Sequence, residues 1–151
     1  MSLETARNYM AQALSLARQA SDMGEVPVGA IIVRNGEVIA QGHNAPRALH
    51  DPTAHAEIGA IRSAALALGN DRLTDCDLWV TLEPCAMCAG AIAHARIRRL
   101  YYGASDPKGG AVEHGPRVFE QDTTLHRPEV YDGIFADEAA DLLKGFFAAR
   151  R

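Results

Sequence analysis

Short apolar runs alternate with helical patterns along this chain, and that alternation is the feature that most constrains its fold. The apolar run Val28–Val33 is followed by Asn35-Gly36, a strong signal for a two-residue hairpin, and the chain returns at Val38–Ala40. Two later segments, Leu78–Leu82 and Arg99–Gly103, have the length and composition of strands. The pattern therefore predicts four strands.

Segments with helical spacing surround these strands. Asp51-Pro52 predicts the beginning of one helix, because Asp favours the N-cap and Pro the first helical position. Residues 105–127 are rich in Gly, Pro and charge, so we expect an irregular segment there. Strands that alternate with helices predict an α/β fold with a sheet covered on both faces. The helices are expected from the N-terminus to before Gly24, within Thr53–Leu68, from Pro84 to near His94, and over Asp137–Ala149.

The size and composition of the chain predict one domain over residues 1–151. Its 151 residues, 48% hydrophobic and 23% charged, are enough for a single buried core. No stretch approaches the roughly 18 apolar residues of a membrane span, and the N-terminus is unlike a signal peptide. We therefore expect a cytoplasmic protein with no membrane partner. The net charge of −4 excludes a generally basic nucleic-acid-binding surface, although a local basic patch remains compatible with it.

Two of the predicted helices begin with residues that bind metals. His55 lies at one beginning, and Cys85 and Cys88 form a Cys-x-x-Cys pair at the other. A helix N-terminus favours thiolates, and both sulfurs of such a pair can reach one centre. One imidazole and two thiolates supply three of the four positions of tetrahedral zinc, which is the pattern of a catalytic site with water as the fourth ligand.

Cys76 is the alternative fourth ligand, and it would make the zinc site structural instead. It precedes the Leu78–Leu82 strand, whereas Cys85 follows that strand. Five strand residues separate the two ends by roughly 16 Å, and zinc ligands lie within about 2.3 Å of the metal. We therefore expect Cys76 to be a packed thiol and the fourth ligand to be water.

Glu57 stands two residues after His55 and adds a catalytic carboxylate to the proposed zinc site. A carboxylate in a first helical turn also has a simple electrostatic explanation, because it complements the helix dipole. Beside zinc-bound water, however, it can take a proton from that water and deliver it elsewhere. The combination His-x-Glu … Pro-Cys-x-x-Cys, beginning at His55 and ending at Cys88, is the signature of the zinc nucleobase deaminases.

At these residues the sequence resembles the cytidine/deoxycytidylate deaminase superfamily. Within it, the bacterial tRNA-specific adenosine deaminases are most similar, and the resemblance covers nearly the whole chain. Its most distinctive segments are Glu25–Ala30, Asp51–Glu57 and Val80–Gly90. Further similarity lies at Tyr102-Gly103-Ala104, at Asp106 with Lys108, and in the closing segment Phe146–Arg151.

The resemblance implies a three-layer α/β/α cytidine-deaminase-like fold, with a central mixed sheet of about five strands and helices on both faces. It also implies a homodimer with one zinc ion per subunit, bound by His55, Cys85 and Cys88 and a water. The implied reaction is hydrolysis of the wobble adenosine in the anticodon loop of an arginine tRNA to inosine, with release of ammonia and with Glu57 as the proton carrier.

The resemblance further implies which residues contact the substrate. Asn44 corresponds to the asparagine that holds the flipped nucleoside, and Asp106 and Phe146 correspond to positions near the anticodon strand. Ala54 completes the expected substrate-binding set. Arg150 and Arg151 are either a solvated chain end or RNA contacts.

Two other functions remain open from the sequence. The first is deamination of a free base or nucleoside, of guanine or cytosine type, since the same zinc motif performs that attack and an isoelectric point near 5.8 suits a small substrate. The second is a binding module stabilised by zinc, which would use a closed site with four protein ligands.

Overall fold

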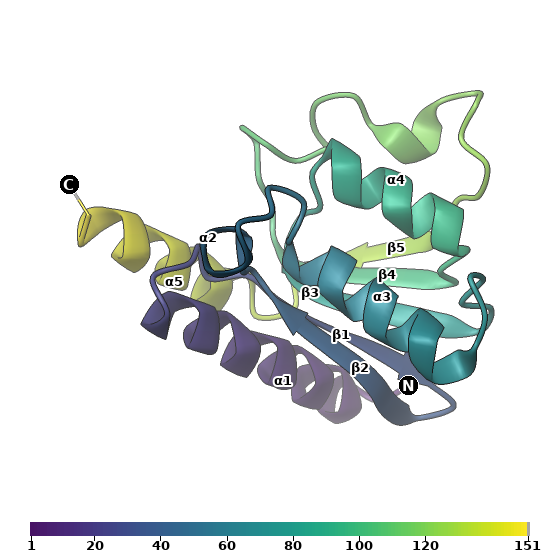
Figure 1. Cartoon of the computed structure of the whole chain (residues 1–151), viewed down its shortest axis with the longest axis horizontal. Coiled ribbons are helices and arrows are strands. Elements are labelled where there is room, and N and C mark those ends of the chain that lie inside the picture. The colour runs from purple at the N-terminus through teal and green to yellow at the C-terminus, as the bar shows by residue number, and fades with distance from the viewer. Residues whose placement is uncertain (151) are drawn as a thin grey trace.

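A five-stranded mixed sheet forms the centre of the computed structural model, which describes residues 1–150 (Figure 1). The strand order is β2-β1-β3-β4-β5. Strand β1 pairs antiparallel with both β2 and β3, whereas β3, β4 and β5 run parallel to one another. The strands are β1 (Gly29–Arg34), β2 (Glu37–His43), β3 (Cys76–Leu82), β4 (Arg99–Ala104) and β5 (Glu129–Asp132).

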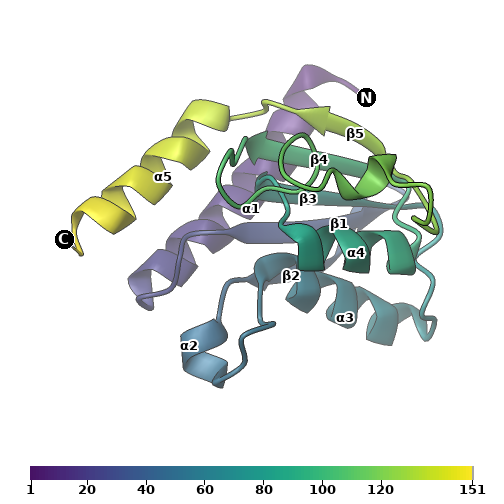
Figure 2. The same ribbon diagram turned by 90° about the horizontal axis from the view of Figure 1, so that it is seen from above.

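Helices cover both faces of the sheet, as predicted. Figure 2 shows α3 and α4 on one face and α1 and α5 on the other. Among the helices of residues 1–150, none combines the length and apolar character that crossing a membrane requires. The helices are α1 (Leu3–Asp22), α2 (Pro46–Leu49), α3 (Ala56–Leu68), α4 (Ala86–Ala95) and α5 (Ala136–Ala148), with one 3-10 turn, η1, at Val118–Glu120.

The alternation of side chains along β1 divides the core into two layers. Ala30 and Ile32 face α3 and α4, where Ile92 of α4 packs with them. Ile31 faces α1 and lies in a cluster with Trp79, whose ring stacks on that of Tyr101 with 3.8 Å between centroids. Because both faces of the inner strands are buried, their sequences are mostly apolar and do not alternate between polar and apolar residues.

Two helices begin later than the sequence predicts. The Asp51 carboxylate accepts hydrogen bonds from the backbone N–H and the hydroxyl of Thr53, which forms a local turn in place of a helix. Helix α3 consequently begins at Ala56 with His55 as its N-cap, and α4 begins at Ala86 with Cys85 as its N-cap.

The sequence patterns also miss two short elements. All four residues of β5 are exposed, so the strand lacks an alternation of buried and exposed side chains and is recognised by its backbone pairing with β4. Helix α2 is a single turn whose backbone N–H groups at Arg47 and Ala48 donate to the buried carboxylate of Glu25. Both elements depend on partners that are distant in sequence.

Helix α3 lies unusually close to β2 at Gly42. A Cβ atom at Gly42 would stand 2.4 Å from the carbonyl oxygen of Ala56 and 2.8 Å from the backbone nitrogen of Ala60. Both atoms belong to the helix backbone and cannot turn away as a side chain would. Helix α3 can therefore occupy its observed position only because residue 42 is a glycine, which has no Cβ atom.

We predict that Gly42→Ala lowers the free energy of unfolding by about 2 kcal/mol, because the added methyl group overpacks a rigid contact. Gly145→Ala is the matched control, since a Cβ at Gly145 of α5 meets no atom within 4 Å. That variant should be about 0.5–1 kcal/mol more stable from the gain in helix propensity. Urea denaturation measures both, and equal stabilities of the two variants would contradict the close contact.

Candidate active site

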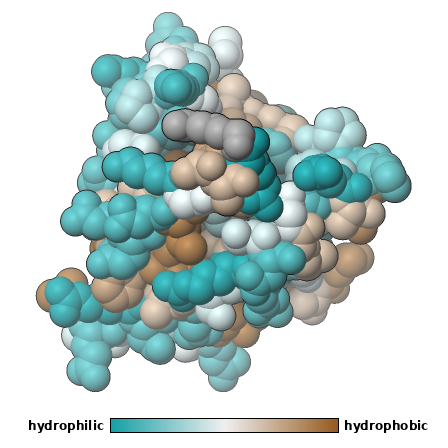
Figure 3. All heavy atoms as spheres, turned by 90° about the vertical axis from the view of Figure 1, so that its left-hand side faces the viewer, coloured by the Kyte–Doolittle hydropathy of each residue, from teal (hydrophilic) through white to brown (hydrophobic). Residues whose placement is uncertain are grey.

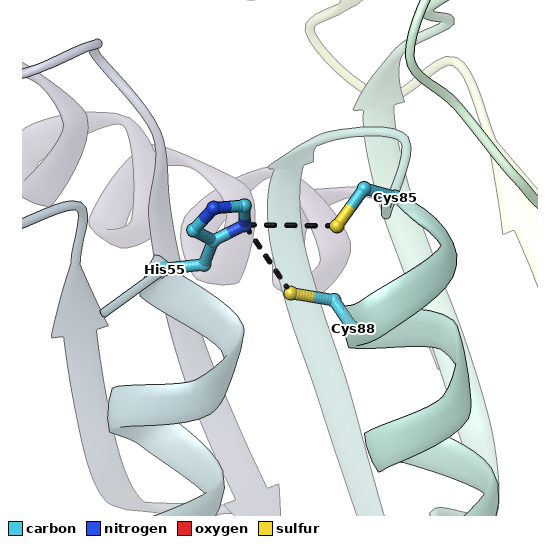
Figure 4. Close-up of side chains that lie close together, drawn as sticks. All are labelled: His55, Cys85 and Cys88. Carbon is cyan, nitrogen blue, oxygen red and sulfur yellow. Dashed lines mark hydrogen bonds between the residues drawn. The ribbon is translucent and has the colours of Figure 1, made fainter. Parts of the chain in front are cut away.

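His55, Cys85 and Cys88 point toward one another between the beginnings of α3 and α4 (Figure 4). The Nδ1 atom of His55 lies 3.6 Å from the sulfur of Cys85 and 3.6 Å from the sulfur of Cys88. All three donor atoms lie within 4.8 Å of one another. The structure therefore brings together the three residues that the sequence predicts as metal ligands.

The geometry of this group fits tetrahedral zinc. Zn–N bonds of about 2.0 Å and Zn–S bonds of about 2.3 Å at tetrahedral angles place nitrogen and sulfur about 3.5 Å apart, close to the 3.6 Å observed. An imidazole with two thiolates is also a donor set that zinc favours. The group contains three protein donors within residues 1–150, and Cys76 is not among them.

Cys76 is a packed thiol, as predicted. It is fully buried at the first position of β3, and its sulfur donates to the carbonyl oxygen of Thr74. Burial raises the pKa of this thiol, so the neutral form is favoured. Its side chain contributes to the core and not to the ligand group.

The three clustered donors differ in their proton affinity. The hydrogen bond with Cys88, followed by that with His55, lowers the pKa of Cys85 to about 4 against the effect of burial. The same contact with Cys85, together with burial, raises the pKa of Cys88. The hydrogen bond with Cys85 raises the pKa of His55. Cys85 is consequently the thiol that loses its proton more readily, and its position at a helix N-terminus suits a negative charge.

Glu57 is buried beside this group in the first turn of α3. Only 4% of its surface is exposed, and burial raises the pKa of its carboxyl group to about 7. A carboxyl group in such a position can both accept and donate a proton near neutral pH. The structure thus gives Glu57 the surroundings that the predicted proton carrier needs.

A cavity of about 280 Å³ opens onto these side chains. Two of the four predicted substrate contacts, Asn44 and Asp106, lie in its wall. Ala54 and Phe146 are buried and are not among its lining residues. The wall is formed by Val26, Val28, Asn44, Pro46, His55, Glu57, Leu82, Glu83, Cys85, Asp106 and Gly109.

Asn44 also supports the beginning of α3. Its Oδ1 atom accepts a hydrogen bond of 2.8 Å from the backbone N–H of Ala56, the residue after His55. The backbone of Ala54 is engaged as well, because its carbonyl oxygen accepts from the N–H of Ala45. These bonds tie the loop after β2 to the segment that carries His55.

A second hollow, of about 490 Å³, adjoins the cavity and shares Val26, Leu82 and Asp106 with it. Helix α5 supplies its far wall through Leu143 and Phe147. Figure 3, which views the end of the molecule where α2 and α5 lie, shows hydrophobic residues gathered among hydrophilic ones there.

Phe147 is therefore the aromatic residue of α5 that lines this hollow. Phe146 lies beneath the guanidinium of Arg150, whose central carbon is 3.4 Å from the ring centroid. Substrate contact by Phe146 stays a prediction, and Arg151 lies outside the described residues.

Two buried carboxylates at this site were not singled out as functional residues by the sequence patterns. Glu25 accepts hydrogen bonds from the backbone of α2, and Glu83 accepts them from the segment after β4. Burial raises the pKa of Glu83, but hydrogen bonds from the Asp106 amide and the His114 ring hold it below its ordinary value. Their only sequence signal was their place within the distinctive segments Glu25–Ala30 and Val80–Gly90.

The fold and the residues of the site define an enzyme of the deaminase class. A mixed sheet carries, at the beginnings of two helices, a His-Cys-Cys group and a buried glutamate. The chain belongs to the MafB19-like deaminase family, whose model matches residues 4–151.

Individual relatives agree with this assignment. The chain is 56% identical over 144 residues to a tRNA-specific adenosine deaminase of Agrobacterium fabrum, covering 95% of each protein. A solved structure from work on A-to-I editing by tRNA:A34 deaminases superimposes with a TM-score of 0.89 at 57% identity, covering 90% of this chain and 99% of that one. A guanine deaminase from Bacillus subtilis gives a TM-score of 0.65 at 42% identity over 70% of this chain and 66% of the other.

We predict that Cys88→Ala abolishes stoichiometric metal binding, because two remaining donors hold a metal far more weakly than three. Cys76→Ala is the matched control and should retain about one metal ion per chain. Elemental analysis of both purified variants gives the metal content and its identity. Equal metal loss from the two variants would mean that Cys76 also binds the metal.

Proposed function

We propose that this enzyme hydrolyses adenosine to inosine at the wobble position of a tRNA anticodon, of an arginine tRNA, with release of ammonia. The observation that carries the proposal is the similarity to the tRNA:A34 deaminase structure, which extends over 90% of this chain. The cavity beside Glu57, at about 280 Å³, is a small concave site into which one base can be inserted.

His55, Cys85 and Cys88 would hold one zinc ion per subunit, with a water molecule as the fourth ligand. The donor set and the 3.6 Å nitrogen–sulfur distances support this choice of metal. When bound, zinc supplies Lewis-acid activation of the water that attacks the base.

Glu57 carries the protons of the reaction. Its carboxylate takes one proton from the attacking water and delivers it to N1 of adenine while the new C6–O bond forms. It then takes the second proton from that oxygen and delivers it to N6 as the C6–N6 bond breaks. The products are inosine and ammonia, and Glu57 returns to its initial state.

The remaining predicted contacts would orient the nucleotide. Asn44 lies in the wall of the cavity and would hold the flipped nucleoside. Asp106 in the cavity wall and the buried Phe146 would lie near the anticodon strand, and Ala54 would complete the substrate-binding set. An anticodon loop is single-stranded, so presenting its base costs less than extracting one from a duplex.

The assembly and location of the enzyme follow from the same family resemblance. We propose a homodimer of single-domain chains, covering residues 1–151 each, in the cytoplasm where a tRNA substrate is processed. The partly apolar groove between the outer sides of α3 and α4, which contains Ile58, Ile61 and Ala91, supports association of two copies.

Deamination of a free purine is the second candidate function. The likeness to a guanine deaminase at 42% identity favours it, and both functions use the same metal chemistry. The two candidates differ in whether the anticodon loop is needed for binding.

We predict that Glu57→Gln lowers the turnover number by at least roughly 10²-fold, the scale of general acid–base catalysis, because an amide cannot carry the proton. The variant should keep its zinc, since Glu57 is not one of the three clustered donors. Inosine formation on a tRNA transcript and zinc analysis of the same sample measure both effects.

Glu4→Gln, another glutamate in a first helical turn but an exposed one, is the matched control and should keep full activity. A Glu57→Gln enzyme with zinc and undiminished turnover would sink the assigned role. It would favour a binding module or a different proton carrier.

We further predict that an arginine tRNA anticodon stem-loop is deaminated, whereas free guanine, cytosine and adenosine are not, at equal concentrations. The physical reason is that the hollow beside α5 extends the binding surface beyond one base. Ammonia release from each substrate is the measurement. Release from free guanine alone would replace the tRNA proposal with the second candidate.

A further inference from the structure

The segment that follows β4 forms one wall of the active-site cavity, and the buried carboxylate of Glu83 is the side chain that binds its backbone at several points. Asp106 and Gly109 of this segment line the cavity, and Glu83 lies between β3 and the zinc-binding residue Cys85. We propose that Glu83 is a positioning residue, which fixes the wall at Asp106 and Gly109 relative to Cys85. This inference rests on the proposed deamination.

Five hydrogen bonds converge on the two oxygens of Glu83. Its Oε2 atom accepts from three consecutive backbone N–H groups, those of Val112, Glu113 and His114, at 3.0–3.2 Å. Its Oε1 atom accepts from the N–H of Asp106 at 3.0 Å and makes a 2.8 Å contact with the Nδ1 of His114. The side chain is completely buried, so water does not compete for these bonds.

The bonds join this carboxylate to both ends of the turn that forms the wall. Asp106 lies at the beginning of the turn, and its own Oδ1 accepts from the N–H groups of Lys108 and Gly109. Val112 and its two successors lie just beyond the end of the turn. A shift of Asp106 would therefore also shift Gly109 in the cavity.

The backbone around Glu83 connects the same segment to the metal-binding strand and helix. The N–H of Glu83 donates to the carbonyl of Ala104, and the N–H of Ala111 donates to the carbonyl of Pro84. The fit is close, because a Cβ at Gly110 would stand 2.4 Å from the Glu83 carboxyl carbon. Glu83 thus sets the distance between the cavity wall and Cys85 without lying among the metal donors.

Glu83→Gln isolates this role because the amide is nearly the same size. Its single carbonyl oxygen is expected on the side of the three consecutive N–H groups, which offer the most donors. Its NH₂ group then faces the N–H of Asp106, so two donors oppose each other and Asp106 is displaced. The metal ligands and Glu57 are left in place.

The experiment compares wild type and Glu83→Gln for zinc content, KM and turnover on the anticodon stem-loop, and amide hydrogen exchange in residues 106–114. We expect unchanged zinc and a fall in kcat/KM of roughly tenfold or more, with a raised KM, because a small misplacement of a binding wall is costly. Exchange at Asp106 should become faster. A purely structural role would instead lower turnover and stability with KM unchanged, and that result would overturn the proposal.

Two further variants act as controls. Glu120→Gln removes an exposed carboxylate of the same region, which pairs with Arg117, and should leave KM and exchange unchanged. His114→Ala removes the ring contact but retains every backbone bond to Glu83, so it should change KM less than Glu83→Gln does. A larger effect of His114→Ala would transfer the role from Glu83 to the histidine.

The controls also separate the proposal from the function on which it rests. If wild type deaminates a free purine and not the stem-loop, the tRNA proposal fails and the same comparison is made with that purine. Unchanged KM and exchange in Glu83→Gln on whichever substrate the wild type uses would contradict the positioning role alone.

Discussion

The active site depends on the close approach of two helix N-termini, those of α3 and α4, at one end of the sheet. Each helix presents one residue of the His-Cys-Cys group as its N-cap, His55 in one case and Cys85 in the other. Unpaired N–H groups at a helix N-terminus favour negative charge, which suits a thiolate. The position of α3 in turn depends on Gly42, since a Cβ there would collide with the helix backbone.

Buried carboxylates attach the irregular segments around the cavity to this rigid centre. Glu25 accepts hydrogen bonds from the backbone of α2, and Glu83 accepts them from the segment that contains Asp106. A segment without regular secondary structure has many backbone N–H groups that no helix or sheet hydrogen bond satisfies. One buried carboxylate can accept hydrogen bonds from several of these N–H groups at once, and these bonds hold the loop in one conformation at the cavity.

The two glutamates in the wall of the cavity, Glu57 and Glu83, are placed for different tasks. Glu83 is surrounded by hydrogen-bond donors, which favour its charged form. Glu57 is buried with much less such compensation, and burial raises its pKa to about 7. Environment alone distinguishes a carboxylate that anchors backbone from one that can exchange a proton.

The sequence by itself determined the elements and residues whose signals are local. Apolar runs and the Asn35-Gly36 turn indicated the four strands β1 to β4. The motif from His55 to Cys88 indicated the group of three donors, because ligands of such a sheet lie beside the helix beginnings at one end of it. Only the tertiary structure decided β5, α2 and the contacts of Glu83. Each of these depends on hydrogen bonds between groups that are distant in sequence. Local sequence patterns do not indicate which backbone N–H group pairs with which distant oxygen, because that pairing is set by the packing of the whole chain.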